Sequence, residues 1–129
     1  MSRFIALALK NEDITIYGDG YQTRTFCYID DNVDACYNAA IHNLLINDVA
    51  NIGGEIEITM IDLAQKVIEL TGSKSKMVYL PPLEEGDMKR RYPDISKMKN
   101  LLNRDLLPIE EGIKKVLEDT SHIIEKERN

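Results

Sequence analysis

The chain has 129 residues, with 16 lysines and arginines against 22 aspartates and glutamates, and a formal net charge of −6 at pH 7. This length fits one domain that buries roughly two-thirds of its unfolded-chain surface, and a hydrophobic content of 43% is ordinary for a globular protein. The acidic balance argues against a general nucleic-acid binder, because such affinity depends on clustered lysine and arginine.

Targeting signals and metal motifs are not suggested either. No apolar run approaches the roughly 20 residues of a membrane span, and the five-residue apolar stretch after Arg3 is too short for a signal peptide. Cys27 and Cys36 lie nine residues apart without a CxxC motif or a neighbouring histidine, which argues against a disulfide framework and a zinc site. We therefore expect a cytoplasmic protein with two buried thiols and no membrane contact.

The first half of the chain alternates between helical periodicity and short β-branched runs. Between the first two strands, Gly18-Asp19-Gly20 predicts a turn with unusual backbone angles. In chain order we expect a helix over 2–10, strands over 14–17 and 25–29, a helix capped by Asp30 or Asp31, and a possible short strand over 49–52.

The second half carries clearer helix boundaries. Thr59, three residues before Asp62, is close to a capping-box pattern and opens a helix that Gly72 follows. We then expect a strand over 77–80, a polar loop over 83–92, a short helix capped by Asp94, and a last helix starting at Pro108 with the apolar stripe Ile109, Ile113, Val116, Leu117, Ile123 and Ile124. With no repeat or linker, residues 1–129 form one mixed α/β unit.

The segment from Tyr17 to Arg24 is the first candidate site. A glycine turn lets the backbone approach a ligand closely, and Arg24 offers a planar fork of donors suited to phosphate. The alternative is a tight hairpin turn with a solvated arginine, which the commonness of short Gly-x-Gly turns favours when the segment is taken alone.

Two further charged clusters are candidate sites. Lys89-Arg90-Arg91 could clamp a diphosphate, or could be a solvated basic run that offsets the preceding Glu84, Glu85 and Asp87. Asp30-Asp31 offers too few oxygen ligands nearby for a metal, so helix capping explains this pair better.

Catalytic motifs are missing from the sequence. There is no GxGxxG or GxxxxGK[ST] loop, no tyrosine followed four residues later by lysine, and no Gly-x-Ser-x-Gly elbow. His42 and His122 lie in predicted helices without an obvious nucleophile. The residues alone predict a small α/β domain with a capacity for anion binding, no catalytic group and no metal ligands.

Taken together and in order, several segments resemble the extended short-chain dehydrogenases of the NAD-dependent epimerase/dehydratase family, which act on nucleotide sugars. Within that family the UDP-glucuronate decarboxylases are the most similar, followed by dTDP-glucose dehydratases and UDP-glucose epimerases. The segments that carry the resemblance are 2–10, 14–20, 22–31, 51–54, 58–64, 91–97 and 108–113.

The resemblance implies a site for a UDP-sugar. It implies that Ser2, Arg3 and Phe4 line the nucleotide pocket, and that the tyrosine of the Tyr17-Gly18-Asp19 turn packs at the base. It also implies that Arg24 reaches the diphosphate and that Arg91 makes a second phosphate or ribose contact, with Arg90 as its substitute if the register shifts by one residue.

The same resemblance implies a fold and its limits. Family enzymes begin with a Rossmann domain that carries a glycine-rich NAD loop and a catalytic Tyr-x-x-x-Lys pair, and this sequence contains neither. We therefore expect the small mixed α/β substrate-binding domain of an extended short-chain dehydrogenase, lacking the N-terminal Rossmann half. Alone it would bind no NAD and would not be catalytic.

Loss of that half would leave the apolar faces of residues 33–52 uncovered, and such a surface usually marks an interface. A homodimer or a separately encoded Rossmann-domain partner would cover it. A second hypothesis is an interaction module that has lost ligand binding and docks to a full-length relative. A third, an independent small enzyme, has no nucleophile or acid–base pair in its favour.

Overall fold

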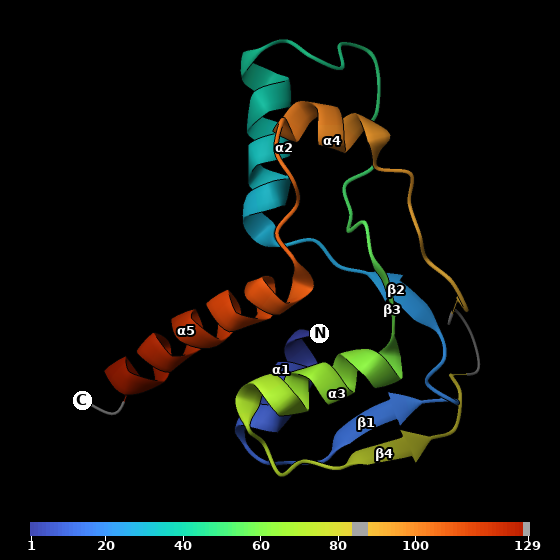
Figure 1. Ribbon diagram of the computed structural model, residues 1–129, viewed down its shortest axis with the longest axis vertical. Helices are drawn as coiled ribbons and strands as arrows, with labels where there is room; N and C mark the ends of the chain where they lie inside the picture. The colour runs from blue at the N-terminus through green and yellow to red at the C-terminus, as the bar shows by residue number, and fades with distance from the viewer. Residues whose placement is uncertain (84–87, 128–129) are drawn as a thin grey trace.

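The structure, a computed structural model, describes residues 1–83 and 88–127, with side chains described as far as residue 120. This described part contains five helices and four short strands (Figure 1). They are α1 (Ser2–Leu9), β1 (Ile14–Tyr17), β2 (Thr23–Thr25), α2 (Ile29–Ile41), β3 (Glu57–Thr59), α3 (Met60–Thr71), β4 (Met77–Leu80), α4 (Ser96–Leu102) and α5 (Ile109–Glu127). None of the described helices is long and apolar enough to cross a bilayer.

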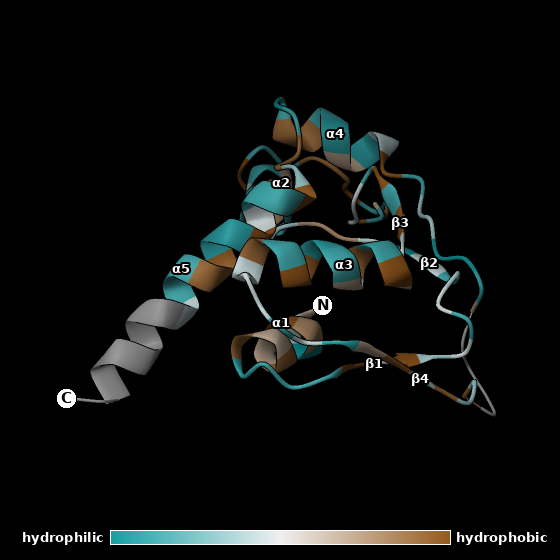
Figure 2. Cartoon of the chain, turned by 60° about the horizontal axis from the view of Figure 1, so that its bottom comes forward, coloured by the Kyte–Doolittle hydropathy of each residue, from teal (hydrophilic) through white to brown (hydrophobic). Residues whose placement is uncertain are grey.

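The larger core lies between helices α1 and α3 and the sheet of β1 and β4. These two strands pair in parallel, from Ile14 opposite Met77 to Tyr17 opposite Leu80. The apolar side of α3 faces α1 and the polar side faces away (Figure 2). The buried residues of this core are Phe4, Ile5, Ala8, Ile14, Ile16, Leu63, Ala64, Val67 and Ile113.

A second, smaller core joins α2 to α4, which lie together at the opposite end of the molecule from β1 and β4 (Figure 1). Its buried residues are Ala35, Ile95, Met98, Leu101 and Leu102. Strands β2 and β3 lie between the two cores and pair antiparallel, with Thr23 opposite Thr59 and Thr25 opposite Glu57. The fold is therefore the small mixed α/β unit that the sequence predicts.

Helix α3 confirms both of its predicted ends. Thr59 is the N-cap residue, and its Oγ1 accepts a hydrogen bond of 3.0 Å from the Asp62 N–H. Gly72 ends the helix with φ at +63°, in the left-handed region that glycine adopts without a steric cost.

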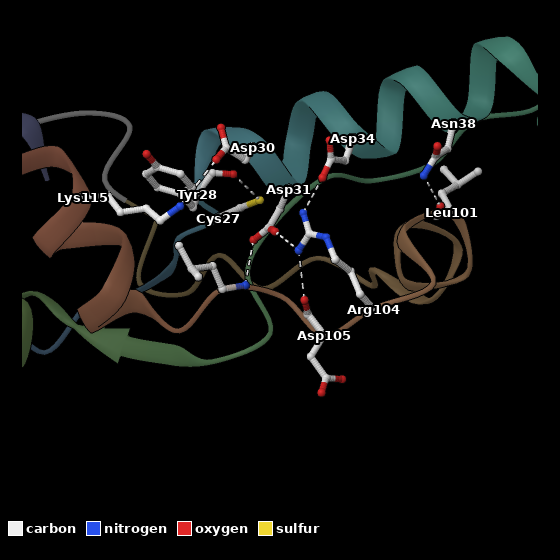
Figure 3. A network of polar contacts seen from close by, with 11 residues as sticks. Cys27, Tyr28, Asp30, Asp31, Asp34, Asn38, Leu101, Arg104, Asp105 and Lys115 are labelled. Atoms are coloured by element: carbon white, nitrogen blue, oxygen red, sulfur yellow. Dashed lines mark hydrogen bonds and ion pairs between the residues drawn. The ribbon is translucent and has the colours of Figure 1, made fainter. Parts of the chain in front are cut away.

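The predictions for the segment 25–29 and for the cap of α2 are wrong. Strand β2 stops at Thr25, and α2 begins with Tyr28 as a cap that makes no side-chain hydrogen bond. Asp30 and Asp31 both lie within the first turn. Asp31 is buried and bonds to Arg104 instead of capping the helix (Figure 3).

The possible strand over 49–52 is absent from the described fold. Side chains near α4 hold this segment in place of a neighbouring strand: Lys97 Nζ donates to the Val49 carbonyl at 2.8 Å, and Asn51 Nδ2 donates to the Asp94 carbonyl at 3.1 Å. Its extended residues therefore have tertiary partners without joining a sheet.

Other predictions need smaller corrections. The short helix α4 begins at Ser96 with Ile95 at its N-cap, although the Asp94 carboxylate does accept a hydrogen bond from the Ser96 N–H. Cys27 is half-buried and Cys36 is exposed, so the two thiols are not both buried.

Helix α5 follows Pro108 directly, and its residues Ile109, Ile113, Val116 and Leu117 pack on the larger core as predicted. Ile123 and Ile124 of the predicted stripe lie outside the residues whose side chains are described.

One face of α2 carries an uncovered apolar stripe, which confirms the predicted exposure. Its side chains recur about every four residues, so they share one side of the helix, opposite the side that packs on α4. We call this surface the α2 stripe; it consists of Ile29, Val33, Tyr37 and Ile41 on the helix and Leu44 in the turn that follows it.

Candidate functional site

Two adjoining pockets lie around the end of β1, the glycine turn and β2. The turn pocket has a volume of about 530 Å³ and is lined by Tyr17, Gly18, Asp19, Tyr21, Gln22, Leu80, Pro82, Leu83 and Lys89. The arginine pocket has a volume of about 340 Å³ and is lined by Met1, Arg3, Phe4, Thr15, Ile16, Tyr17, Gln22, Arg24, Phe26, Met60 and Leu83. Tyr17, Gln22 and Leu83 line both pockets, so the two pockets form one continuous depression.

The glycine turn between β1 and β2 shapes this depression. Gly18 and Gly20 have φ values of +69° and +77°, which other residues adopt only with strain. A Cβ atom on Gly20 would also lie 2.6 Å from Ile61 Cγ1. Asp19 Oδ1 accepts the Tyr21 N–H at 3.0 Å, so the turn is held by its own side chain.

The strand alternation of β2 decides which side chains enter the arginine pocket. Gln22 and Arg24, two residues apart, both line it. Gln22 Nε2 donates to the Tyr17 carbonyl at 2.9 Å, which ties the two strands at the border of both pockets. Arg24 Nη1 donates to the Thr23 and Met88 carbonyls, each at 2.7 Å. The guanidinium of Arg24 is thus held in a fixed position at the pocket wall.

Charge in the depression favours an anion. Arg3 from α1 and Arg24 from β2 line the arginine pocket, and Lys89 lines the turn pocket; among the described residues that line the two pockets, Asp19 is the one carboxylate. Arginine offers a planar fork that matches phosphate and carboxylate. Phe4 and Tyr17 line the same pocket and offer ring surfaces. This combination suits a ligand with both an anionic and a planar part.

The structure brings most of the predicted site residues together. Arg3, Phe4, Tyr17 and Arg24 line the arginine pocket, and Tyr17, Gly18 and Asp19 line the turn pocket. Two predicted residues, Ser2 and Arg91, are exposed and line neither pocket. The backbone of Arg91 does lie next to Arg24, because its N–H donates to the Thr23 carbonyl at 3.2 Å.

Arg90 forms an ion pair with Glu57. Its Nε and Nη2 donate to Glu57 Oε1 and Oε2, each at 2.9 Å, and its guanidinium lies 5.0 Å from the Tyr92 ring centre. The hydrogen bonds from Arg90 are the largest cause that holds the pKa of Glu57 below its usual value, and a hydrogen bond from Thr23 adds a smaller effect. Glu84, Glu85 and Asp87, the predicted partners of the basic run, lie outside the described residues.

Sequence reasoning missed two residues of this region, Gln22 and Glu57. The spacing of Gln22 and Arg24 along a strand could have identified the first, because residues two apart share a face. No local signal identifies Glu57, whose partner Arg90 is 33 positions away. Within the described residues, no group of three histidines, cysteines or carboxylates could hold a metal ion.

Comparisons with known proteins identify relatives of this chain. Residues 1–53 match the profile of the NAD dependent epimerase/dehydratase family. The chain is 37% identical to UDP-glucuronic acid decarboxylase 1 of Danio rerio, over all of this chain and 30% of that protein. It is 35% identical to the UDP-N-acetyl-alpha-D-glucosaminuronate decarboxylase of Bacillus cytotoxicus, over 90% of this chain and 38% of that protein.

Solved structures resemble the fold closely. UDP-glucose 4-epimerase of Thermotoga maritima, solved with UDP-glucose, superposes with a TM-score of 0.83 at 31% identity, over 95% of this chain and 39% of that one. UDP-glucuronic acid 4-epimerase of Bacillus cereus, solved with UDP-glucuronic acid and NAD, gives a TM-score of 0.76 at 31% identity, over 87% of this chain and 36% of that one. The chain thus spans about a third of the length of these relatives.

Proposed function

The chain belongs, as a partial-length relative, to the NAD-dependent epimerase/dehydratase family, and on that premise we propose that it binds the nucleotide of a UDP-sugar. The observation that carries the proposal is the arginine pocket, where Arg3 and Arg24 lie beside Phe4 and Tyr17. Guanidinium groups suit a diphosphate and aromatic rings suit a base. Two structural relatives were solved with UDP-sugars, which supports this ligand class.

Each site residue predicted from the sequence has a role in this proposal. Arg24 contacts the diphosphate and Tyr17 packs at the uracil, with Gly18 and Asp19 shaping the wall. Arg3 and Phe4 form the border of the nucleotide pocket on α1, and the exposed Ser2 lies next to them in the chain. Arg91 supplies a second phosphate or ribose contact from the segment next to β2.

The described residues do not fit NAD. A dinucleotide site needs a glycine turn between a parallel strand and the start of a helix. In the described fold, β1 leads through its glycine turn to β2, and β4 leads to Pro81 and Pro82. We therefore assign no chemical step to the described residues: their proposed role is to hold the nucleotide-sugar.

Calorimetric titration with UDP tests the proposal. We expect a dissociation constant in the micromolar to millimolar range for the unaltered chain. Arg24→Ala removes a charged hydrogen-bond donor from the phosphate and should weaken binding by about tenfold or more. Lys74→Ala, which removes an exposed cation that lines neither pocket, is the matched control and should bind as the unaltered chain does. No heat at millimolar UDP from folded protein would overturn the proposal.

The α2 stripe favours a second candidate function, that of an interaction module. Its side chains remain 47% to 61% exposed, which is unusual for a contiguous apolar helix face. A second copy of the chain or a separate cofactor-binding domain would cover it. Sedimentation of the unaltered chain should then show self-association that Tyr37→Glu abolishes and that Tyr79→Glu, on exposed β4, leaves unchanged. Association that is insensitive to Arg24→Ala would separate this role from ligand binding.

A further inference from the structure

Strand β2, which carries Arg24, has a backbone partner along each edge, and the second partner is the segment 88–91. Strand β2 pairs with β3 along one edge. Along its other edge, the Thr23 N–H donates to the Lys89 carbonyl at 2.9 Å, and the Arg91 N–H donates to the Thr23 carbonyl at 3.2 Å. These bonds form a parallel bridge between Thr23 and Arg90. The segment that carries the basic run is therefore an edge partner of the strand that carries Arg24.

One carboxylate spans this arrangement. Glu57 on β3 accepts hydrogen bonds from Nε and Nη2 of Arg90 and from the Thr23 hydroxyl. It thus connects β3, β2 and the segment 88–91 through side chains alone. Bidentate contact between arginine and a carboxylate is the most directional form of ion pair. We call this set the Glu57 clasp, made of Glu57, Thr23 and Arg90.

The clasp and the pockets lie on opposite faces of β2. Thr23 belongs to the clasp, whereas its neighbours Gln22 and Arg24 line the arginine pocket. Lys89, next to Arg90, lines the turn pocket. Alternation along the same segment puts Arg91 on the side of Lys89. When Arg90 pairs with Glu57, the segment 88–91 is therefore aligned with β2 so that Lys89 and Arg91 lie on the same side of the strand as Arg24.

We propose that the Glu57 clasp sets this register and so positions Lys89 and Arg91 to bind the diphosphate of a nucleotide ligand together with Arg24. The proposal rests on the proposed function and adds Glu57 and Arg90 to it as positioning residues. A slip of one residue would turn Arg90 toward the pockets and Lys89 and Arg91 away from them. The paired Glu57 carboxylate opposes that slip, because in the slipped register it would lose its bidentate partner.

The test compares UDP affinity in two salt concentrations. Arg90→Ala and Glu57→Ala should each weaken UDP binding by about two- to fivefold at low salt. The difference in UDP affinity between each variant and the unaltered chain should vanish near 1 M salt. At that concentration a screening length of about 3 Å suppresses the contribution of Lys89 and Arg91. The double exchange Glu57→Arg with Arg90→Glu should restore the low-salt affinity. Lys99→Ala, which breaks the nearby ion pair with Glu55, is the matched control.

The outcomes separate the two proposals. Unchanged affinity in both single variants, or an equal loss at both salt concentrations, would overturn the clasp as a positioning device while leaving UDP binding in place. A failure of the double exchange to restore affinity would do the same. If the folded, unaltered chain shows no UDP binding, the proposed function and the clasp proposal fall together.

Discussion

Asp31 and Arg104 form an ion pair between residues 73 positions apart, with 2.5 Å between Asp31 Oδ1 and Arg104 Nη1 (Figure 3). The second carboxylate oxygen, Oδ2, accepts the Leu107 N–H at 3.0 Å. Asp31 is 1% exposed, and its position in the first turn of α2 ties that helix to the chain between α4 and α5. Asp34, one turn later, binds the same guanidinium from the surface.

The first prediction concerns this pair of carboxylates. Asp31→Ala leaves a backbone donor and a guanidinium without their acceptor, so we expect a loss of about 1–3 kcal/mol in the free energy of unfolding. Asp34→Ala removes only an exposed partner of Arg104 and should cost less than about 1 kcal/mol. Urea unfolding of both variants measures the difference. Equal losses would mean that burial of Asp31 adds nothing to this contact.

The second prediction concerns Gly54, which lies against the backbone of Phe26. A Cβ atom on Gly54 would lie 2.7 Å from the Phe26 nitrogen and closer still to its carbonyl oxygen. Gly54→Ala must therefore displace backbone, and we expect it to destabilise the fold by at least about 2 kcal/mol. Gly112→Ala, in α5 at 3.4 Å from the Tyr28 ring, should be close to neutral or stabilising. Thermal unfolding of the two variants is the measurement, and an equally mild effect at both positions would contradict the prediction.

The third prediction concerns the two thiols. Burial, followed by the nearby Asp31 charge, raises the pKa of Cys27 to about 11. At about pH 8, on the order of one Cys27 in a thousand is then a thiolate, the form that reacts. Cys36 is exposed on α2. Titration with a chromogenic disulfide should show one fast thiol in the native protein, and Cys36→Ser should remove that fast phase. Two fast thiols would refute this assignment.

The fourth prediction concerns acid stability through Glu110 and Lys66. Their ion pair, 2.5 Å long, joins α5 to α3, and the hydrogen bond from Lys66 is the main cause that lowers the pKa of Glu110 from its ordinary 4.5. A lowered pKa in the folded state gives stability that is present above the unfolded value and is lost as pH falls through the folded value. Because Glu110 is 43% exposed, this contribution stays below about 1 kcal/mol.

Urea unfolding between about pH 7 and pH 3 checks the sign. Glu110→Gln should be less stable than the unaltered chain at neutral pH, and the two should converge in acid. Glu111→Gln, which loses a pair with Lys114 on the same helix, is the control. A difference that grows as the pH falls would contradict the argument.

Local patterns predicted the elements whose boundaries are set locally. Thr59 and Gly72 delimit α3 because a hydroxyl cap and a left-handed glycine are signals within the helix's own sequence. The start of α2 was mispredicted for the opposite reason. Aspartate is a residue type that often caps the N-terminus of a helix, but the partner of Asp31 is Arg104, which is distant in sequence, and only folding brings the two together. The prediction that Cys36 is buried is wrong because it rests on an apolar helix face, and in the fold that face is the uncovered one.

The candidate site also has parts that the sequence predicts and parts that depend on the fold. The turn around Gly18 and the arginine that follows it were visible in the sequence, and both lie at one depression. The sequence does not predict which member of the basic run lies beside Arg24, because this depends on a strand register that no short segment encodes. In the fold, Arg90 is bridged to Thr23 and pairs with Glu57.

The parallel sheet has a consequence for the order in which the chain assembles. The N–H of Lys76, just before β4, donates to the carboxylate of Asp13, just before β1, across 63 positions. A contact of that span forms only after a long loop has closed, whereas α1 and α3 form from neighbouring residues. During synthesis, β1 can therefore pair with β4 only after β4 has left the ribosome. Leu80 of β4 pairs with Tyr17 and lines the depression at the end of β1, so this depression is complete only after the two strands have paired.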